Sequence, residues 1–207
     1  MIDARLHLAL DGGGLELPAE GTIAVFQPPR DSDLPGLDKD RVQIIHGFKP
    51  DYDAWAARGY NVVRTIKDRY AACIVCLPRA KAEARAVIAA ACEVCDGIVV
   101  IDGQKTDGAD SVLREMRDRV TVQGPISKAH GKMFWISEPA AEFFTDWRQG
   151  PELTEGGFWT APGVFSADGV DLASALLVDA LPEKLGAEVA DLGAGWGFLS
   201  AHALTRP

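Results

Sequence analysis

Short apolar runs rich in valine and isoleucine recur through the first half of the chain, bounded by glycine, proline or charged residues. Such runs are typical of strands buried on both faces, as in a parallel sheet. We expect strands at 22–26, 42–45, 61–65, 72–77 and 97–102. This recurrence constrains the fold more than any single motif, because parallel strands need a crossover connection between them.

Helical patterns fill several of the intervals between these runs. The stretch 51–59 ends at Gly59, a typical helix C-terminal residue, and 79–96 is predicted as a long alanine-rich helix that ends before Gly97. A third helix, 108–119, follows the fifth strand, with Asp110 placed as its cap. Alternation of strands and helices predicts a mostly parallel sheet covered by helices on both faces.

Two further strands, 120–127 and 132–137, are joined through "KAHG", with Gly131 as the expected turn residue. We expect them to pair in antiparallel fashion at one edge of the sheet. Five alternating strands followed by a terminal hairpin form the layout of the class I methyltransferase sheet, a Rossmann-like α/β fold. Residues 1–138 are therefore expected to make one complete domain of this shape.

Residues 139–159 connect this domain to the C-terminal segment of the chain. They carry Phe143, Phe144 and Trp147, large aromatic side chains that need burial. We therefore expect a packed connector rather than a flexible linker.

The segment 160–207 begins a second domain of the same kind. A helix over 172–181 leads to a strand starting at Val189, and "DLGAGWG" follows with three glycines at alternate positions. Glycine is needed where backbone passes close to a ligand or adopts conformations closed to residues with a Cβ. The candidate cofactor-binding residues of this loop are Asp191, Gly193, Ala194, Gly195, Trp196 and Gly197.

The glycine spacing separates two classes of cofactor. The dinucleotide fingerprint places its third glycine three residues after the second, whereas Gly197 comes two residues after Gly195. The spacing favours S-adenosylmethionine over NAD. A nicotinamide-dependent oxidoreductase remains an alternative, as does a strand-to-helix turn that needs glycine for packing alone.

The sequence around this loop resembles a known enzyme family. "TAPGVFSADGVDLASALL" followed by "VADLGAGWGFLS" is similar to the start of the catalytic domain in RsmC-type methyltransferases. Upstream, "CLPRAKAEA", "DGQKTDGADSVLREM" and "SKAHGKMFW" resemble the amino-terminal domain of that family. The resemblance implies two methyltransferase-like domains in tandem, of which the second uses S-adenosylmethionine to methylate guanine N2 in small-subunit ribosomal RNA.

The resemblance also assigns roles to residues upstream of the glycine loop. It implies that Phe165 and Ser166 lie beside the cofactor pocket. Asp168 and Asp171 are expected to cap the helix that follows them. Trp196, inside the loop, either flanks the cofactor or packs behind it.

The first domain lacks the matching cofactor features. Its first strand is followed by "QPPRDSDLPG", in which two prolines fix the backbone and remove amide donors. Its fourth strand ends in "LPR", residues 77–79, where the catalytic half of the family has Asn-Pro-Pro-Phe. We interpret residues 1–138 as a degenerate copy that positions RNA and supports folding of the second domain.

The catalytic features that the resemblance implies are not found in the printed sequence. The 207 residues contain no Asn-Pro-Pro-Phe, whose asparagine would orient the guanine amine for in-line methyl transfer. No catalytic residue is therefore assigned. We expect the chain to be the front part of a longer enzyme and inactive by itself.

Four cysteines form two Cys-x2-Cys pairs at a spacing known from zinc sites. Cys73 and Cys76 lie in an expected strand, where residues three apart point to opposite faces. Cys92 and Cys95 are expected to share a helix face. We interpret all four as buried apolar thiols, with no metal site and no disulfide.

Charge and hydrophobicity limit the remaining possibilities. No apolar run approaches the roughly 20 residues of a membrane span, and we expect a cytoplasmic protein. A net charge of −9 argues against coating nucleic acid by charge alone. Basic residues nevertheless form three local clusters that, on one surface, would contact ribosomal RNA or the small ribosomal subunit. These are Arg79, Lys81 and Arg85; Arg114, Arg117 and Arg119; and Lys128, His130 and Lys132.

Each basic cluster by itself is better explained as a solvated face, and His130 as a hairpin-tip residue. A free-standing RNA-binding or assembly module without catalysis is therefore a further alternative. The sequence leaves the oligomeric state and the identity of the modified guanine open.

Overall fold

The computed structural model describes residues 2–139 and 141–206. It divides into two compact units, Met1–Arg148 (unit 1) and Gln149–Pro207 (unit 2). In the described part of the chain, no helix is long and apolar enough to cross a membrane. The expected connector is divided between the two units, because the division falls inside 139–159.

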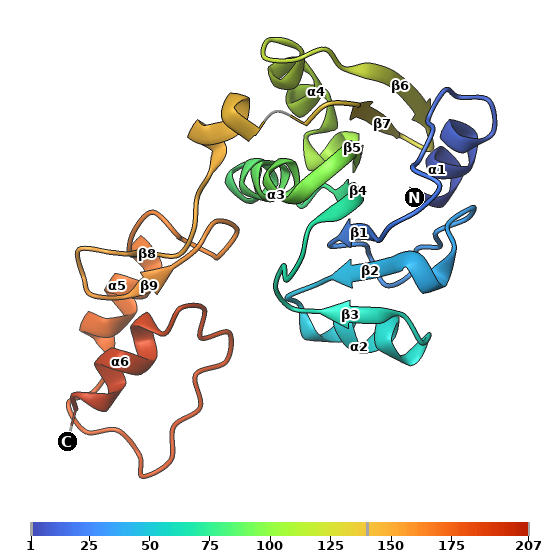
Figure 1. Cartoon of the computed structure of the whole chain (residues 1–207). Helices are drawn as coiled ribbons and strands as arrows, with labels where there is room; N and C mark the ends of the chain where they lie inside the picture. The colour runs from blue at the N-terminus through green and yellow to red at the C-terminus, as the bar shows by residue number, and fades with distance from the viewer. Residues whose placement is uncertain (1, 140, 207) are drawn as a thin grey trace. The chain divides into compact units, whose positions relative to one another are not determined.

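Unit 1 is built on a seven-stranded mixed sheet with the order β3-β2-β1-β4-β5-β7-β6 (Figure 1). Strands β3, β2, β1, β4 and β5 run parallel, and β7 pairs in antiparallel fashion with both β5 and β6. This confirms the predicted α/β fold with an edge hairpin. The strands are β1 Ile23–Phe26, β2 Val42–Ile45, β3 Asn61–Val63, β4 Tyr70–Cys76, β5 Cys95–Gln104, β6 Gln123–Lys128 and β7 Gly131–Ile136.

Helices cover both faces of this sheet. The core on one face packs α3 (Lys81–Val94), α4 (Ala109–Arg117) and the 3₁₀ helix η3 (Ala141–Trp147) against the strands. The core on the other face packs α1 (Ile2–Leu10) and α2 (Lys49–Ala57). Two short 3₁₀ helices, η1 Lys39–Arg41 and η2 Lys105–Asp107, complete the unit.

The alternation of side chains in β4 divides its residues between the two cores. Cys73 belongs to the core under α3 and Cys76 to the opposite one, which confirms that they face opposite sides. Cys95 is the first residue of β5, so the expectation that Cys92 and Cys95 share a helix face was wrong. All four thiols are buried and unpaired by disulfides. Burial raises the pKa of Cys92 to about 12.

The hairpin turn differs from the prediction. Ala129 and His130 form the two-residue turn between β6 and β7, with φ of 48° and 56°. Two consecutive positive φ angles match the twist of the flanking strands. Gly131 instead begins β7, where a Cβ would lie 2.6 Å from the carbonyl oxygen of Gly103. Its missing side chain therefore permits close strand packing, and the assignment as turn residue was wrong.

Helix α1 is an element for which the sequence suggested no structure. Its Arg5 is buried and forms an ion pair with Asp102 of β5, with hydrogen bonds of 2.5 and 2.8 Å. The same guanidinium donates to the carbonyl oxygen of Lys128, 2.9 Å away. A single arginine thus joins α1 to both β5 and the hairpin.

The aromatic residues before residue 149 pack as part of unit 1. Phe144 and Trp147 are fully buried against the core under α3, as expected. Phe143 is 49% exposed, contrary to the expectation that all three aromatic side chains would be buried.

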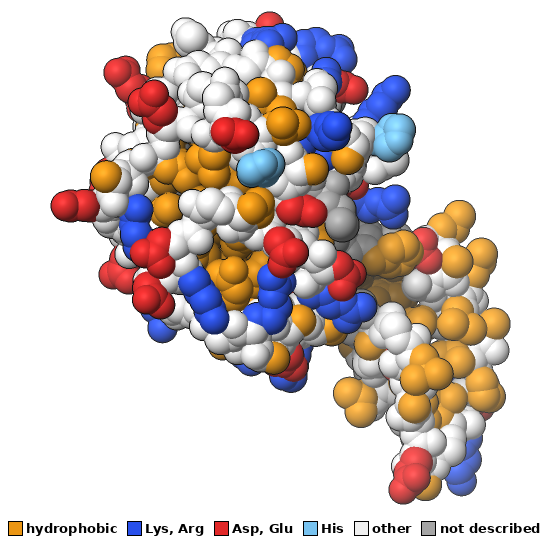
Figure 2. Space-filling model, turned by 90° about the vertical axis from the view of Figure 1, so that its right-hand side faces the viewer, with side chains coloured by type: hydrophobic (Ala, Val, Ile, Leu, Met, Phe, Trp, Pro, Cys, Tyr) orange, Lys and Arg blue, Asp and Glu red, His pale blue; other side chains and the backbone are white. Residues whose placement is uncertain are grey.

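Unit 2 contains the small antiparallel pair β8 (Glu152–Leu153) and β9 (Trp159–Thr160), together with α5 (Leu172–Ala180) and α6 (Phe198–Leu204). The strand expected at Val189 is not formed. Among the described residues of unit 2, no further strand is available to pair with it. Val189 and Leu192 are consequently exposed, and hydrophobic side chains are frequent on the visible surface of unit 2 (Figure 2).

Candidate cofactor site

The glycine loop of unit 2 forms a turn that only glycine adopts without strain throughout. Gly193, Gly195 and Gly197 have φ of 79°, 58° and 93°, all in the left-handed region. A Cβ added at Gly193 or Gly197 would meet no atom within 4 Å. The outer side of the turn is therefore open, and a ligand can approach its backbone closely.

One hydrogen bond connects Asp191 to α6, and another closes the turn itself. The hydroxyl of Ser200 donates to Oδ2 of Asp191 over 2.7 Å. The amide of Gly197 donates to the carbonyl oxygen of Ala194 over 2.9 Å. Asp191 is thus held beside the first turn of α6, although the strand expected before it is absent.

Trp196 brings the upstream candidate residues to the loop. Its Nε1 donates to the carbonyl oxygen of Phe165 over 3.1 Å, and Ser166 follows with a φ of 51°. The indole also packs against the rings of Phe158 and Phe198, with ring centroids 4.8 and 5.7 Å apart. Sequence reasoning missed both phenylalanines, because nothing in their spacing indicates a contact with the loop.

Cavities of unit 2 lie beside two of the candidate residues. A cavity of about 640 Å³ is lined by Trp196 together with 152–156 and 167–170. A second, of about 600 Å³, is lined by Asp191 and by mostly apolar residues of α5, α6 and the segment 181–190. The structure places Phe165 and Trp196 together, but it does not place Asp191 and Trp196 in one cavity.

Asp171 has the structural role that was expected. It is the N-cap of α5, where its carboxylate accepts from the backbone amide of Ser174 over 2.9 Å. The Ser174 hydroxyl donates to the same oxygen over 3.1 Å. Asp168 lies on the wall of the larger cavity.

The open glycine turn and the nearby carboxylate fit one wall of an S-adenosylmethionine site. Because the glycines have no Cβ, the backbone of the turn stays accessible to a ligand. The carboxylate of Asp191 can accept hydrogen bonds from polar groups of that ligand. Phe165 is 69% exposed, so its ring is accessible to an apolar or aromatic part of a ligand.

Residues 155–207 match the family model of the methyltransferase small domain. Two curated relatives are similar over part of the chain, and both are named ribosomal RNA small subunit methyltransferase C. The protein of Erwinia tasmaniensis is 42% identical over 74 residues, which are 35% of this chain and 20% of that protein. The protein of Serratia proteamaculans is 30% identical over 105 residues, which are 50% of this chain and 30% of that protein.

Over these parts the chain is similar to RsmC. Among solved structures, a 16S rRNA N2 methyltransferase (RsmC) of T. thermophilus, in complex with AdoMet and guanosine, aligns with a TM-score of 0.61. It is 20% identical, and the alignment covers 86% of this chain and 52% of that one. At this identity the likeness shows the shared fold. The matches to the curated relatives span 20% and 30% of those proteins' lengths.

In unit 1, the segment after β1, residues 27–36, is packed against side chains of the same unit. Nε1 of Trp55 donates to the carbonyl oxygen of Pro28 over 2.9 Å. Arg58 donates to the carbonyl oxygen of Ser32 over 2.7 Å and stacks 4.1 Å from the Trp55 ring. The loop "QPPRDSDLPG" is therefore held onto α2 and offers no open glycine turn.

His46, at the end of β2, is a buried polar residue that sequence reasoning missed. Its Nδ1 accepts from the backbone amide of Phe48 over 3.2 Å, and its Nε2 lies 3.4 Å from Asp51. Burial lowers the pKa of His46, although Asp51 opposes this shift. The side chain also contacts the backbone of Pro28, in the loop after β1.

Several basic side chains of unit 1 are paired with carboxylates. Lys81 and Arg85 of α3 both contact Glu115 of α4, at 2.5 and 2.8 Å. Arg119 forms two hydrogen bonds with Asp146, of 2.6 and 2.8 Å. Burial raises the pKa of Glu115, but hydrogen bonds from Lys81, Arg85 and Ser111 outweigh this effect and lower it to about 2.

Proposed function

We propose that this RsmC-like chain is part of an S-adenosylmethionine-dependent methyltransferase that modifies guanine N2 of small-subunit ribosomal RNA. The observation that carries the proposal is the open, left-handed turn at Gly193, Gly195 and Gly197, held beside Asp191 and Trp196. The names of the curated relatives and the RNA, AdoMet and guanosine named for the solved structure support it.

In this proposal unit 2 contributes one wall of the cofactor pocket. Gly193 to Gly197 allow the cofactor close to the backbone, and Phe165 and Trp196 form the flanking apolar surface. The cofactor, when bound, supplies the methyl group. The 207 residues contain no Asn-Pro-Pro-Phe, and we propose that cofactor contact rather than catalysis is what this segment provides.

Unit 1 contributes no cofactor site in this proposal. Its sheet has the methyltransferase layout, but the segment after β1 is packed onto Trp55 and Arg58. We propose that unit 1 acts in positioning RNA.

Equilibrium dialysis with S-adenosylhomocysteine and with NAD tests the cofactor assignment. We expect the chain to bind S-adenosylhomocysteine and not NAD. Gly193→Val should weaken this binding roughly tenfold, because a β-branched residue with positive φ costs about 1–2 kcal/mol and its side chain covers the turn. Gly150→Val is the matched control, since Gly150 lies in the same unit without a positive φ and lines neither of the two cavities. Binding of NAD, or equal binding by both variants, would contradict the assignment.

A further inference from the structure

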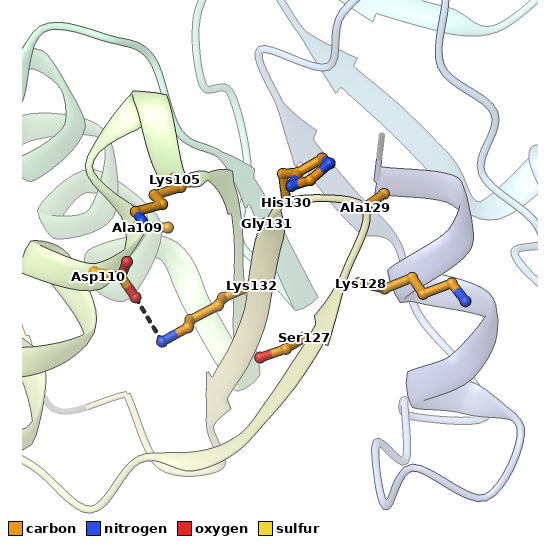
Figure 3. Close-up of a pocket in the computed structure, with 9 residues that line it drawn as sticks. All are labelled: Lys105, Ala109, Asp110, Ser127, Lys128, Ala129, His130, Gly131 and Lys132. Carbon is orange, nitrogen blue, oxygen red and sulfur yellow. Dashed lines mark ion pairs between the residues drawn. The ribbon is translucent and has the colours of Figure 1, made fainter.

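A basic cavity lies at the tip of the β6–β7 hairpin in unit 1 (Figure 3). It has a volume of about 320 Å³, and we call it the hairpin-tip pocket. Four elements contribute polar side chains to it: Lys105 from η2, Asp110 from α4, Ser127 and Lys128 from β6, and Lys132 from β7, with His130 in the turn between the two strands. Lys132 reaches across to Asp110, whereas Lys128 extends away from Lys132 (Figure 3).

Positive charge exceeds negative charge around this pocket. Asp110 pairs with Lys132 at 2.5 Å, with both side chains partly exposed. The hydrogen bond from Lys132 lowers the pKa of Asp110, and the charges of Lys105 and Arg114 lower it further. Three cations thus surround one carboxylate, in a chain whose net charge is −9.

In the other basic clusters of unit 1, several cations are held by carboxylates. Lys81 and Arg85 share Glu115, and Arg119 is held by Asp146. By contrast, Lys105 forms no ion pair with any residue that the structure describes. Lys105 can therefore bind an outside anion at the hairpin-tip pocket without giving up a carboxylate partner among the described residues.

The pocket lies where α/β sheets commonly bind ligands. Strand β5 ends at Gln104, so the pocket is at the carboxyl edge of the parallel strands. The backbone amide of Lys105 donates to the carbonyl oxygen of His130 over 2.9 Å, which joins η2 to the hairpin tip. Arg5 donates to the carbonyl oxygen of Lys128 from the other side. These bonds hold the pocket walls in a fixed arrangement.

Resting on the proposed function in RNA methylation, we propose that the hairpin-tip pocket binds a backbone phosphate of the RNA substrate. The ammonium groups of Lys105 and Lys132 and the hydroxyl of Ser127 donate to the phosphate oxygens, as such groups do in nucleic-acid complexes. An exposed ion pair contributes little net free energy. Lys132 can therefore exchange Asp110 for a phosphate at small cost.

The test measures the affinity of the full chain for a fluorescently labelled small-subunit ribosomal RNA fragment over a range of salt concentrations. Each lysine that contacts a phosphate contributes about 1 to the slope of log K against log salt. We expect Lys105→Ala and Lys132→Ala each to weaken binding and to reduce the slope by about 1. Asp110→Asn should strengthen binding, because it removes the competing carboxylate and keeps the side chain's shape.

Lys67→Ala is the matched control, since Lys67 is an exposed lysine of unit 1 outside the pocket. We expect it to leave affinity and slope unchanged. Phosphate binding predicts that Lys105→Ala weakens RNA binding and Asp110→Asn strengthens it. If the two residues only maintained the structure of the pocket, both variants would weaken RNA binding. The proposal is overturned if the parent chain does not bind the RNA or if Lys105→Ala and Lys67→Ala behave alike.

The same variants are assayed for S-adenosylhomocysteine binding, which involves unit 2 only. Unchanged cofactor binding with weakened RNA binding in Lys105→Ala supports the inference. Unchanged cofactor binding with unchanged RNA binding overturns the inference and leaves the proposed function standing. If the parent chain does not bind S-adenosylhomocysteine, the proposed function itself is contradicted.

Discussion

Arg5 and Asp102 form a buried ion pair between residues 97 positions apart in the sequence. A charged pair in the interior is stable only when each partner satisfies the other, because removing both from water is costly. Burial raises the pKa of Asp102, and the hydrogen bond and charge of Arg5 oppose this shift. The pair therefore joins α1 to the sheet only while both members are present.

Arg5→Met should destabilise unit 1 by about 3–5 kcal/mol at pH 7, since it leaves Asp102 buried without its partner. The pKa of Asp102 then rises further in the folded state. When the pKa of Asp102 is higher in the folded than in the unfolded protein, protonation of Asp102 stabilises the fold. This stabilisation is complete below the unfolded pKa of about 3.9 and is lost as pH rises through the folded pKa. The loss should therefore be smaller at pH 4 than at pH 7. Urea unfolding followed by tryptophan fluorescence measures it.

Arg5→Met combined with Asp102→Asn provides the control, because it removes the titrating group. We expect the stability difference between this double variant and Arg5→Met to grow from pH 4 to pH 7. A loss in Arg5→Met that is the same at both pH values would contradict the assignment of a buried, charged Asp102.

At the residue scale, the sequence predicted features that depend on a residue and its chain neighbours, but not those that depend on distant partners. Gly193, Gly195 and Gly197 were predicted to adopt conformations closed to residues with a Cβ, and their positive φ angles confirm this; their contact with a ligand stays a prediction. Gly131 was misassigned, because the need for a missing Cβ arises from Gly103 in a neighbouring strand. Arg5 gave no local signal at all, since its partner is fixed only by the tertiary fold.

At the level of elements, Glu115 connects α3 to α4 over the core of unit 1. Lys81 and Arg85 reach it from α3, and Ser111 donates to it from within α4 over 3.0 Å. Its pKa of about 2 is below that of an ordinary glutamate. Because the pKa of Glu115 is lower in the folded than in the unfolded protein, ionised Glu115 stabilises the fold at pH values above its unfolded pKa. This stabilisation is lost as pH falls toward 2.

Glu115→Gln should lower the free energy of unfolding by about 1–2 kcal/mol at pH 7, allowing for the partial exposure of the partners. Near pH 2 the variant and the parent should be equally stable. Chemical denaturation at several pH values measures both. Glu93→Gln on α3 is the matched control, since its contact with Arg148 is longer, at 3.8 Å, and both side chains are exposed. A loss that does not change with pH would contradict this role.

Elements were predictable where their signal was local. The strands of unit 1 carry runs of valine and isoleucine, and β2 was predicted with the bounds that it has. Helix α1 was missed because Arg5, a charged residue, interrupts the buried face of Ile2, Leu6 and Ala9. The strand expected at Val189 did not form, because a strand depends on a neighbour and not on its own sequence alone.

For the molecule as a whole, the two units differ in what their methyltransferase-like features can do. Unit 1 has the complete seven-stranded sheet, but Trp55 and Arg58 close the segment after its first strand. Unit 2 has the open glycine turn without a sheet around it. This difference is the basis of the proposal that unit 2 contacts the cofactor and unit 1 contacts RNA.

The most direct test of this assignment is a titration of the isotope-labelled chain with S-adenosylhomocysteine, followed by amide chemical shifts. We expect shift changes in 191–197 and at Phe165 and Ser166, with none in 27–36 of unit 1. Changes in 27–36 would contradict the assignment, as would an unchanged glycine turn at saturating ligand.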